Sequence, residues 1–475
     1  MFIDARSIPN DQIVETDICI IGAGAAGITL ARQFSGQPFR VAVLESGDIK
    51  GDNATQALAK GNSTGLPYYP IESTRLRMFG GTTNHWGGTC RPFSEIDFEA
   101  RDWIPHSGWP IRKDDLMPYY DRARVICDVS SPEWDLADWE KRDRLPILPL
   151  PAERVGSRVA QVIPVARRSF GKLYRDDIDH STNVTTYLNA NVTEIETNDE
   201  GTTVIGVQIA CLSGNRFSLK ARMFILAAGG IENARILLYS NRQQPAGLGN
   251  QNDLVGRFFM EHPRLEAGRV IPADRHLEVG FYETHPVGAT RLKGYVGLTE
   301  AIIRKEKLVD VQVNMLPVYS AAYRKSHGSG DVGSLKYLIQ KLRHREIPQD
   351  FGTHVSNVVS DLLTAQELFL PVAPLPLPKP LALRRIVDGD AEAREQLLPS
   401  MLGDIAAVAN EEIFSNTLID HVKLSTRIDP VPNPDSRVKL GTTRDALGLP
   451  RIDFHWQLSP LDKHSVRRSL EIMGA

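Results

Sequence analysis

Short, uninterrupted apolar runs mark the first regular elements of the chain. Residues 18–21 (ICII) and 41–44 (VAVL) are apolar throughout, which is typical of strands buried on both faces of a parallel sheet. Residues 28–34, between them, have a helical pattern. The three segments together predict a strand–turn–helix–strand unit. A third run, residues 223–228, predicts another buried strand, and a helix is expected over 231–238.

The rest of the chain gives weaker patterns. Period-two alternation over residues 184–210 predicts an antiparallel meander. Residues 51–79 contain many turn formers and predict a loop-rich excursion, and the glycines of residues 80–93 predict a structured loop. The remaining expected elements are a helix over 112–127, strands at 438–440 and 452–456, and a helix over 459–473.

A proline-rich segment interrupts the middle of the chain at residues 367–385. Its prolines at 371, 374, 376, 378 and 380 exclude a helix or central strand and favour an extended backbone. We interpret it as a rigid loop that covers a second domain. An alternative is a loop that docks on a membrane surface or a partner, flanked by Arg384 and Arg385.

Length and composition narrow the class of protein. A chain of 475 residues predicts two or three structural units. The 55 Lys and Arg against 58 Asp and Glu leave a net charge of -3, so nothing in the charge favours nucleic acid as a partner. No apolar run is long enough to span a membrane, and residues 1–17 lack the apolar core of a signal peptide. We therefore expect a cytoplasmic protein without membrane contact.

The four cysteines, at positions 19, 90, 127 and 211, are widely separated. They form no CxxC pair, which excludes the common zinc spacings and a disulfide framework. No metal site is predicted, and the cysteine usage fits a reducing compartment.

A glycine fingerprint follows the first apolar strand. Gly22, Gly24 and Gly27 form the pattern G-x-G-x-x-G between a strand and a helix. In this context the first glycine permits a tight turn, the second lets the backbone approach a pyrophosphate, and the third allows close packing of helix on strand. Glu45 ends the second strand, where a carboxylate can accept hydrogen bonds from ribose hydroxyls and repels a 2′-phosphate. The pattern predicts a dinucleotide but does not choose between NAD and FAD.

A second glycine-rich loop bears on that choice. Residues 80–92 contain paired glycines together with Asn84, His85 and Trp86. Such a loop is more often structural than functional when it stands alone. Beside a fingerprint for adenosine it favours FAD, because FAD is longer than one Rossmann half can cover.

Five segments in order carry a resemblance to a known family. They are GAGAAG with Glu45, RMFGGTTNHWGGTCRP, ILAAGGIENARILLYS, GLGNQNDLVGRFFMEHP and PNPDSRVKLGTTRDALGLP. Together they resemble the glucose–methanol–choline (GMC) flavoproteins, in particular the branch that includes pyranose oxidase. The resemblance implies an α/β fold, α+β overall, with a Rossmann-like FAD-binding domain and a mainly antiparallel-sheet substrate domain. It also implies FAD-dependent oxidation of an alcohol, sugar or polyol at a CH–OH group, with hydride passing to flavin N5.

The resemblance also assigns cofactor-binding residues and domain boundaries. Residues 1–262 and 416–475 would form the FAD-binding domain, with an excursion over 51–180, and residues 263–415 the substrate domain. His85 matches a position at which some relatives attach FAD covalently. The electron acceptor, whether O2, a quinone or an electron-transfer protein, stays open. The residues expected to contact FAD are Gly22, Gly24, Gly27 and Glu45 at the ADP half, Arg77, Gly81, Thr82, Asn84, His85 and Trp86 beside the flavin, Val192 at the adenine, and Ala228 and Gly229 near the ribose and pyrophosphate.

The catalytic residues are not found in the sequence. The His/Asn pair of the family is expected beyond Ala475, so the chain is interpreted as truncated, with weakened FAD affinity and little turnover. His262, His421 and His455 are interpreted as structural. Two alternatives remain: a flavin-binding or interaction protein that has lost its catalytic segment, and a flavoprotein of the mutase or hydroxylase type that shares only the fingerprint.

Overall fold

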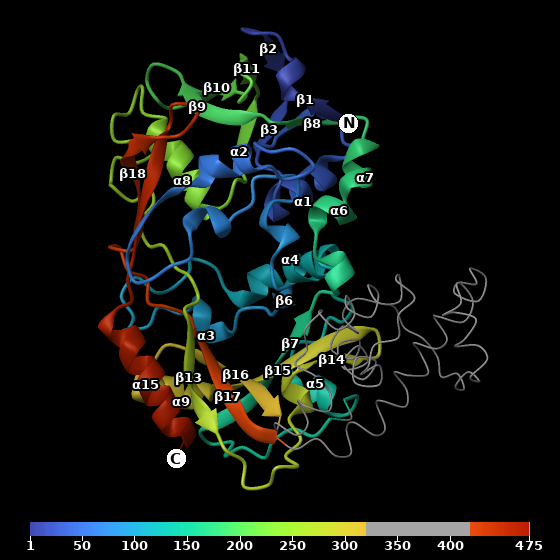
Figure 1. Cartoon of the computed structure of the whole chain (residues 1–475), viewed down its shortest axis with the longest axis vertical. Coiled ribbons are helices and arrows are strands. Elements are labelled where there is room, and N and C mark those ends of the chain that lie inside the picture. The colour runs from blue at the N-terminus through green and yellow to red at the C-terminus, as the bar shows by residue number, and fades with distance from the viewer. Residues whose placement is uncertain (144, 320–418, 475) are drawn as a thin grey trace, which may run out of the picture.

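The computed structural model describes residues 1–143, 145–319 and 419–474. Both interpretations of the proline-rich segment 367–385 lie outside these residues. In Figure 1 an upper part holds the N-terminus and a lower part holds the C-terminus, with loops and short helices between them.

A five-stranded parallel sheet forms the centre of the upper part, in the order β1-β8-β4-β3-β12. Every residue of β3 and β4 is buried, as their unbroken apolar sequence predicts. The strands are β1 (Phe2–Asp4), β3 (Ile18–Ile21), β4 (Val41–Leu44), β8 (Val184–Leu188) and β12 (Met223–Leu226).

The two faces of this sheet pack against different layers. Ile18 and Ile20 point to one face, which is covered by α1 (Ala25–Phe34), α6 (Phe170–Leu173) and α7 (Arg175–Asp179). Cys19 and Ile21 point to the other face, because successive side chains of a strand alternate. There they pack against α8 (Gly230–Tyr239) and a second sheet.

That second sheet has four strands, in the order β2-β11-β10-β9. An antiparallel meander was predicted over residues 184–210, and this prediction is wrong for the first strand. Strand β8 pairs in parallel with β1 and β4 instead. Alternation shows which side chains are buried but not which strand is the partner. The strands are β2 (Ile13–Glu15), β9 (Asn191–Thr197), β10 (Val204–Ala210) and β11 (Arg216–Lys220).

Strand β12 differs from the prediction of a fully buried strand. It ends at Leu226, and Met223 at its start is 53% exposed. The reason is its place at the edge of the sheet, where β3 is its only strand neighbour in the described chain.

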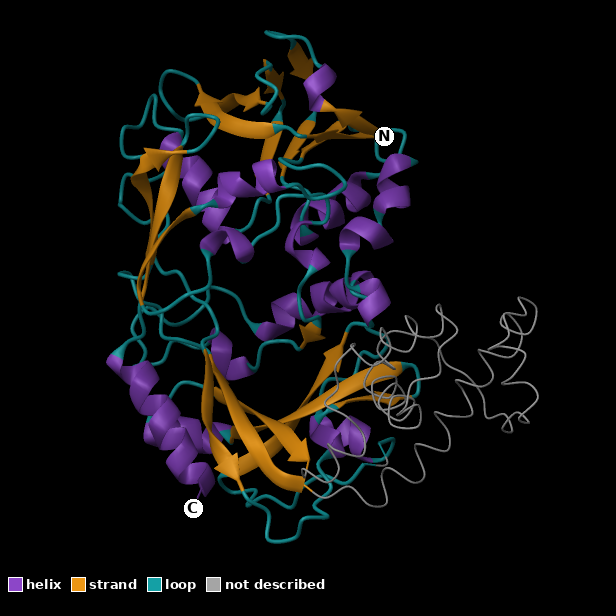
Figure 2. Cartoon of the chain, in the orientation of Figure 1, coloured by secondary structure: helices purple, strands orange, loops and turns teal. Residues whose placement is uncertain are grey.

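A seven-stranded sheet dominates the lower part, and all of its described pairings are antiparallel. Its order is β13-β17-β16-β15-β7-β6, with β14 paired to β15. The predicted fold class, a Rossmann-like part with a second, mainly antiparallel sheet, is therefore confirmed (Figure 2). The strands are β6 (Thr89–Cys90), β7 (Val155–Val162), β13 (Arg264–Val270), β14 (Thr284–Val287), β15 (Thr290–Leu298), β16 (Val311–Tyr319) and β17 (Ile419–Ile428).

The faces of this sheet differ in polarity. Val311, Val313 and Met315 of β16 belong to an apolar core that also includes residues of α5 (Leu136–Glu140), α9 (Glu300–Glu306) and α15 (Pro460–Gly474). The residues that alternate with them, Gln312 and Asn314, are polar and hydrogen-bond to each other. The sheet thus has one apolar and one polar face.

The last strands return to the upper part. Strands β18 (Arg437–Arg444), β19 (Pro450–Trp456) and β5 (Gly61–Gly65) form a three-stranded sheet in this order, which packs on α8. The expected helix over 112–127 is present as α4 (Lys113–Ile126). The remaining helices are α2 (Asn53–Gln56), α3 (Glu95–Phe98) and the 3-10 turns η1 (Ala5–Ser7), η2 (Ala57–Ala59), η3 (Ile71–Ser73), η4 (Gly81–Asn84), η5 (Val165–Arg167) and η6 (Gly280–Tyr282).

The predicted domain boundaries stay a prediction. The seven-stranded sheet contains β6, β7 and β17, which lie in segments that the sequence assigned to the FAD-binding domain.

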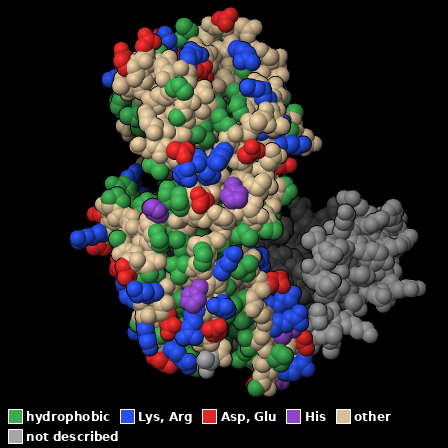
Figure 3. Space-filling model, turned by 90° about the vertical axis from the view of Figure 1, so that its left-hand side faces the viewer, with side chains coloured by type: hydrophobic (Ala, Val, Ile, Leu, Met, Phe, Trp, Pro, Cys, Tyr) green, Lys and Arg blue, Asp and Glu red, His purple; other side chains and the backbone are tan. Residues whose placement is uncertain are grey.

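Figure 3 shows charged and histidine side chains gathered where the upper and lower parts meet. None of the described helices is long and apolar enough to cross a membrane, and the described residues contain no His, Cys, Asp and Glu cluster able to hold a metal.

Candidate cofactor-binding site

The turn between β3 and α1 requires its glycines. Gly22 has φ of 104°, and a Cβ built on it would lie 2.7 Å from the carbonyl oxygen of Ala227. A Cβ on Gly27 would lie 1.9 Å from the carbonyl oxygen of Gly22, so α1 packs directly on the turn. Gly24, by contrast, has no atom within 4 Å of a built Cβ. The backbone at Gly24 therefore borders open space, as an approaching ligand requires.

A second open position follows strand β12, the parallel neighbour of β3. Gly229 is exposed, and a Cβ built on it also has no neighbour within 4 Å. Gly24 and Gly229 are the N-caps of α1 and α8, and neither helix has a side-chain cap. The first N–H groups of an uncapped helix are unpaired donors at the positive end of the helix dipole. The two N-termini therefore fit an anionic diphosphate.

A small cavity of about 50 Å³ lies at the carboxyl ends of β3, β4 and β12. This is the place where ligands bind in open α/β sheets. The predicted residues Gly22, Arg77, Val192 and Ala228 line it. The carbonyl oxygen of Val192 already accepts a 2.6 Å hydrogen bond from Tyr239.

Glu45 is buried beside the cavity and bonds to the backbone. Its carboxylate accepts hydrogen bonds from the N–H groups of Ala23 (3.0 Å) and Gly47 (2.9 Å). Burial raises the pKa of this carboxyl, and the two N–H groups act against that rise. Glu45 thus fixes the turn. Its predicted contact with ribose stays a prediction.

The loop that carries His85 is docked on the same turn. The Gly80 N–H donates to the Ala23 carbonyl oxygen at 2.9 Å, and a Cβ on Gly81 would lie 3.0 Å from the Cα of Gly24. Thr82 and His85 are exposed. The structure therefore brings the two glycine-rich motifs, which are far apart in sequence, into direct contact.

Asn84 and Trp86 of this loop have protein partners. The Asn84 amide donates to the carbonyl oxygen of Phe79 (3.1 Å) and accepts from the hydroxyl of Ser169 (2.5 Å). The Trp86 indole N–H donates to the carbonyl oxygen of Arg168 (2.9 Å). These bonds hold the shape of the loop, so the flavin contacts predicted for both side chains stay a prediction.

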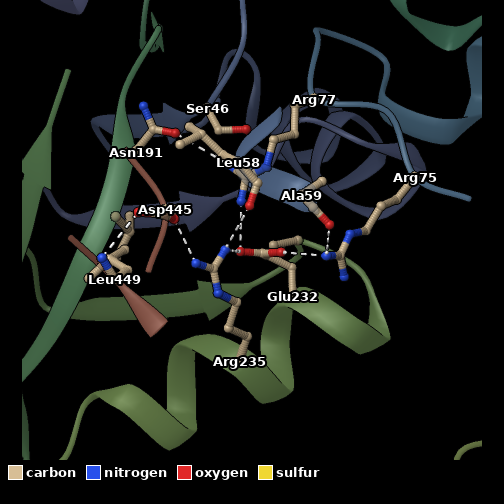
Figure 4. Close-up of polar contacts among 12 residues, drawn as sticks. Ser46, Leu58, Ala59, Arg75, Arg77, Asn191, Glu232, Arg235, Asp445 and Leu449 are labelled. Carbon is tan, nitrogen blue, oxygen red and sulfur yellow. Dashed lines mark hydrogen bonds and ion pairs between the residues drawn. The ribbon is translucent and has the colours of Figure 1, made fainter. Parts of the chain in front are cut away.

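A cluster of buried charges forms one wall of the cavity (Figure 4). Glu232, in the first turn of α8, pairs with Arg77 (2.7 Å), Arg235 (3.1 Å) and Arg75 (3.6 Å). Arg235 also pairs with Asp445 at 2.6 Å. Arg77 therefore lies with the residues expected at the adenosine half, whereas the resemblance placed it beside the flavin.

The charges in this cluster control each other's protonation. Burial disfavours the charged form of Glu232, but Arg77, Arg75 and Arg235 outweigh it and lower its pKa to about 2. Burial lowers the pKa of Arg75 to about 10. The Nε and Nη1 atoms of Arg75 are buried without a hydrogen-bond partner in the structure.

Sequence reasoning missed Glu232, Arg235, Asp445 and Arg75. A signal was present in the helix IENARILLY, where Glu232 and Arg235 stand three positions apart among apolar residues. Such spacing places a pair on one helix face, and a charged pair among apolar residues indicates a buried ion pair.

His262, His421 and His455 do not line the cavity. His262 bonds through Nε2 to Asp429 at 2.7 Å, and this hydrogen bond raises the pKa of His262. His421 bonds to Asp420 and His455 to Thr64.

Comparisons with known proteins agree with this geometry. Residues 17–245 match the family model described as "FAD dependent oxidoreductase". This region is an FAD-dependent oxidoreductase domain. The match spans the glycine turn, the loop with His85 and helix α8, and it agrees with the predicted FAD cofactor.

Individual relatives match over part of their length. The chain is 25% identical to 2-methyl-1,2-propanediol dehydrogenase of Mycolicibacterium austroafricanum, over 52% of this chain and 55% of the relative. It is 25% identical to 6'''-hydroxyparomomycin C oxidase of Streptomyces lividus, over 51% and 53%. It is 21% identical to the fructose dehydrogenase large subunit of Gluconobacter japonicus, over 54% and 60%. The matched part covers little more than half of each relative, and these oxidases and dehydrogenases agree with the GMC resemblance.

Solved structures with similar folds include pyridoxine 4-oxidase from Mesorbium loti, with a TM-score of 0.47 and 15% identity over 96% of this chain and 80% of that one. A formate oxidase structure gives 0.46 and 16% over 98% and 81%.

Glu232→Gln is expected to lower the free energy of unfolding by about 3–5 kcal/mol at neutral pH, because a buried guanidinium cluster loses its shared anion. The folded pKa of about 2 lies below the ordinary 4.5, so this contribution is full above pH 4.5 and is lost as the pH falls toward 2. Urea unfolding of both proteins between about pH 6 and pH 2.5 measures it. Glu200→Gln, at an exposed carboxylate, is the control. A wild-type advantage that is constant across this range would contradict the assignment.

Gly24→Ala separates folding from cofactor binding. The added methyl group meets no atom within 4 Å and the φ of -82° suits alanine, so thermal unfolding of the apoprotein is expected to change little. FAD affinity is expected to fall at least tenfold, about 1.4 kcal/mol, because the methyl group occupies the diphosphate path. Gly156→Ala, also in open space, is the matched control. Equal FAD affinity in the two variants, measured by flavin fluorescence titration, would exclude this path.

Proposed function

We propose that the protein uses FAD to oxidise a CH–OH group of a small alcohol, sugar or polyol. The observation that carries the proposal is the docking of the loop with His85 on the glycine turn. It supports a site in which the diphosphate and the flavin ring occupy adjoining positions. Relatives named for oxidising a propanediol, a hydroxylated aminoglycoside and fructose support a hydroxylated substrate.

Each part of the cofactor has candidate contacts. The N–H groups at the starts of α1 and α8, beyond Gly24 and Gly229, would hold the diphosphate. Gly22 and Gly27 give the turn its shape. The cavity wall at Val192 and Ala228 would receive the adenosine. When bound, FAD supplies the hydride acceptor for the oxidation.

The flavin side of the site would be formed by the loop at Gly81, Thr82 and His85, of which Thr82 and His85 are exposed and Gly81 is buried. Asn84 and Trp86 would act through the shape of the loop that their hydrogen bonds maintain. Glu45 would act in the same way on the glycine turn. Arg77 would contribute positive charge at the adenosine half.

The substrate is expected against the polar face of the seven-stranded sheet. The loop with His85 continues directly into β6, whose Thr89 pairs with Val162 of β7. Arg91, the next residue after β6, donates a hydrogen bond to the hydroxyl of Tyr295 on this face. Arg158 lies across from Tyr295 in the register and pairs with Asp310 at 2.6 Å.

A groove beside these arginines supports a substrate rich in hydroxyl groups. It has a volume of about 570 Å³ and is lined by Arg91, Trp134, Asp135, Asp138 and Arg158, among others. Carboxylates and guanidinium groups can bond to hydroxyls as acceptors and donors, and an aromatic ring can cover the apolar face of a sugar. The groove therefore suits a polyol or sugar better than a purely apolar alcohol.

We further place the protein in the cytoplasm, which agrees with the four cysteines being free thiols. The electron acceptor is proposed to be O2, a quinone or an electron-transfer protein. Oxygen consumption under turnover separates the first from the others.

The direct test is anaerobic mixing of the FAD-loaded protein with a panel of sugars, polyols and simple alcohols. At least one sugar or polyol is expected to bleach the flavin band near 450 nm, roughly the range in which oxidised flavins absorb, and simple alcohols are expected to do so less. A protein that binds FAD but stays oxidised with every donor would contradict CH–OH oxidation by this chain. That result would instead support a flavin-binding protein without catalysis.

Covalent attachment of FAD at His85 has its own test. The imidazole is exposed on the loop that would face the flavin. Acid precipitation of the loaded protein is expected to leave flavin in the pellet, and His85→Ala is expected to release it to the supernatant. His106→Ala, at another exposed histidine, is the control and is expected to retain it. Complete release from the wild-type protein would refute the linkage.

A further inference from the structure

The loop at residues 80–86 has an exposed side and an anchored side. Thr82 and His85 are exposed, whereas Thr83, between them, is only 3% exposed. The anchored side is hydrogen-bonded to residues 168–171, at the start of α6. The glycine turn holds only the first residues of the loop, so the contacts with residues 168–171 decide where its exposed side chains lie.

The hydroxyl of Thr83 joins these two segments. It donates a hydrogen bond to the carbonyl oxygen of Gly80 at 2.6 Å, which closes the turn η4. It also accepts the N–H of Phe170, the first residue of α6, at 3.1 Å. The first N–H groups of a helix have no partner within the helix, so this hydroxyl satisfies a donor that α6 leaves open. Both bonds are buried, and a buried donor or acceptor without a partner destabilises the fold.

Ser169 makes the reciprocal contact from α6 to the loop. Its hydroxyl donates to the side-chain oxygen of Asn84 at 2.5 Å. It also accepts the N–H of Lys172 at 3.2 Å, as the cap of α6. The loop thus completes the start of α6, and α6 in turn fixes the loop.

The backbones of the two segments are also in direct contact. A Cβ built on Gly80 would lie 2.6 Å from the backbone nitrogen of Gly171, and one on Gly171 would lie 2.4 Å from the carbonyl oxygen of Phe79. The rings of Trp86 and Phe170 are 5.3 Å apart. The loop therefore has no room to move toward α6. A loop that loses its hydrogen bonds is expected to move toward its exposed side, where the flavin is proposed.

We propose that Thr83 and Ser169 are positioning residues, which hold the loop in the shape that orients His85 and the flavin ring. Thr83 is buried, so it acts on the cofactor only through the backbone of the loop. The inference rests on the proposed function, because it needs FAD on the exposed side of the loop. A misplacement of about 1 Å can cost about a hundredfold in rate, so a hydroxyl that never touches the cofactor can control the reaction.

The test compares Thr83→Val with Thr83→Ser in the FAD-loaded protein. Valine keeps the shape of threonine without its hydroxyl, whereas serine keeps the hydroxyl. In Thr83→Val, the rate of anaerobic flavin reduction at saturating donor is expected to fall roughly tenfold or more, with the half-saturating donor concentration little changed. The visible circular dichroism of the bound flavin, which reports on the surroundings of the ring, is expected to change as well. Thr83→Ser is expected to restore both.

Thr186→Val is the matched control. Thr186 is 0% exposed, and its hydroxyl has no hydrogen-bond partner in the structure. Its replacement is therefore expected to leave the reduction rate and the circular dichroism unchanged.

Three results would overturn the proposal. They are a wild-type rate and spectrum in Thr83→Val, equal losses in Thr83→Ser and Thr83→Val, and the same loss in Thr186→Val. If Thr83→Val does not fold, Ser169→Ala and its rescue by Ser169→Thr make the same comparison at the second hydroxyl.

The outcomes also separate this inference from the proposed function. A wild-type protein that binds FAD but is reduced by no donor contradicts the proposed function. The circular dichroism of the bound flavin and its rescue by serine need no turnover, so they decide the role of Thr83 in that case too.

Discussion

The turn at the end of β3 is the constraint on which the rest of the site depends. The buried carboxylate of Glu45 accepts a hydrogen bond from the N–H of Ala23 in this turn and another from the N–H of Gly47, just after β4. The carbonyl oxygen of Ala23 in turn accepts the N–H of Gly80. One short segment thus fixes the start of α1, the end of β4 and the loop with His85. A hydrogen-bonded buried carboxylate is stable only while its partners stay in place, so these three segments form one unit.

The charge cluster around Glu232 performs a related task at one wall of the cavity. It joins the segment with Arg75 and Arg77, helix α8 and the segment with Asp445 near the end of the chain. Charges that are removed from water stabilise a fold only when each has partners in good geometry. The cluster therefore selects one arrangement of these segments, and Arg77, Glu232, Arg235 and Asp445 line the cavity. The same charges that set the tertiary structure also create positive charge where an anionic cofactor is expected.

Local signals in the sequence were sufficient for the Rossmann-like unit. Strands β3 and β4 are apolar throughout, and Gly22, Gly24 and Gly27 impose the turn. The unit can therefore be predicted from residues that are close together in the sequence. The docking of Gly80 and Gly81 on that turn was not predictable from spacing, because it is a contact between distant segments. The same limit explains the error over β8, whose alternation fits either an antiparallel or a parallel partner.

The individual roles of the site residues show a similar division. Gly22 and Gly27 lie where a Cβ would meet neighbouring backbone, and Gly24 lies where the backbone is open, whereas their contact with a cofactor stays a prediction. The roles of the polar side chains were harder to predict. The resemblance assigns their positions, but it does not show that Glu45, Asn84 and Trp86 form hydrogen bonds to other parts of the protein. Glu232 and Arg235 were missed because a sequence does not show that a charged helix face is buried. Strands β7 and β17 join a sheet with β13, β15 and β16 across large separations in the chain, which apolar patterns alone do not reveal.

The most direct test of this account is hydrogen–deuterium exchange of the apoprotein with and without FAD. The account predicts that FAD slows exchange together in residues 22–27, 81–86 and 228–232, since the glycine turn, the loop with His85 and the start of α8 would surround one cofactor. Peptides from α9 and α15, on the apolar side of the seven-stranded sheet, are expected to be unchanged. Protection in the lower part of the molecule, with none at the glycine turn and the loop, would contradict the central claim.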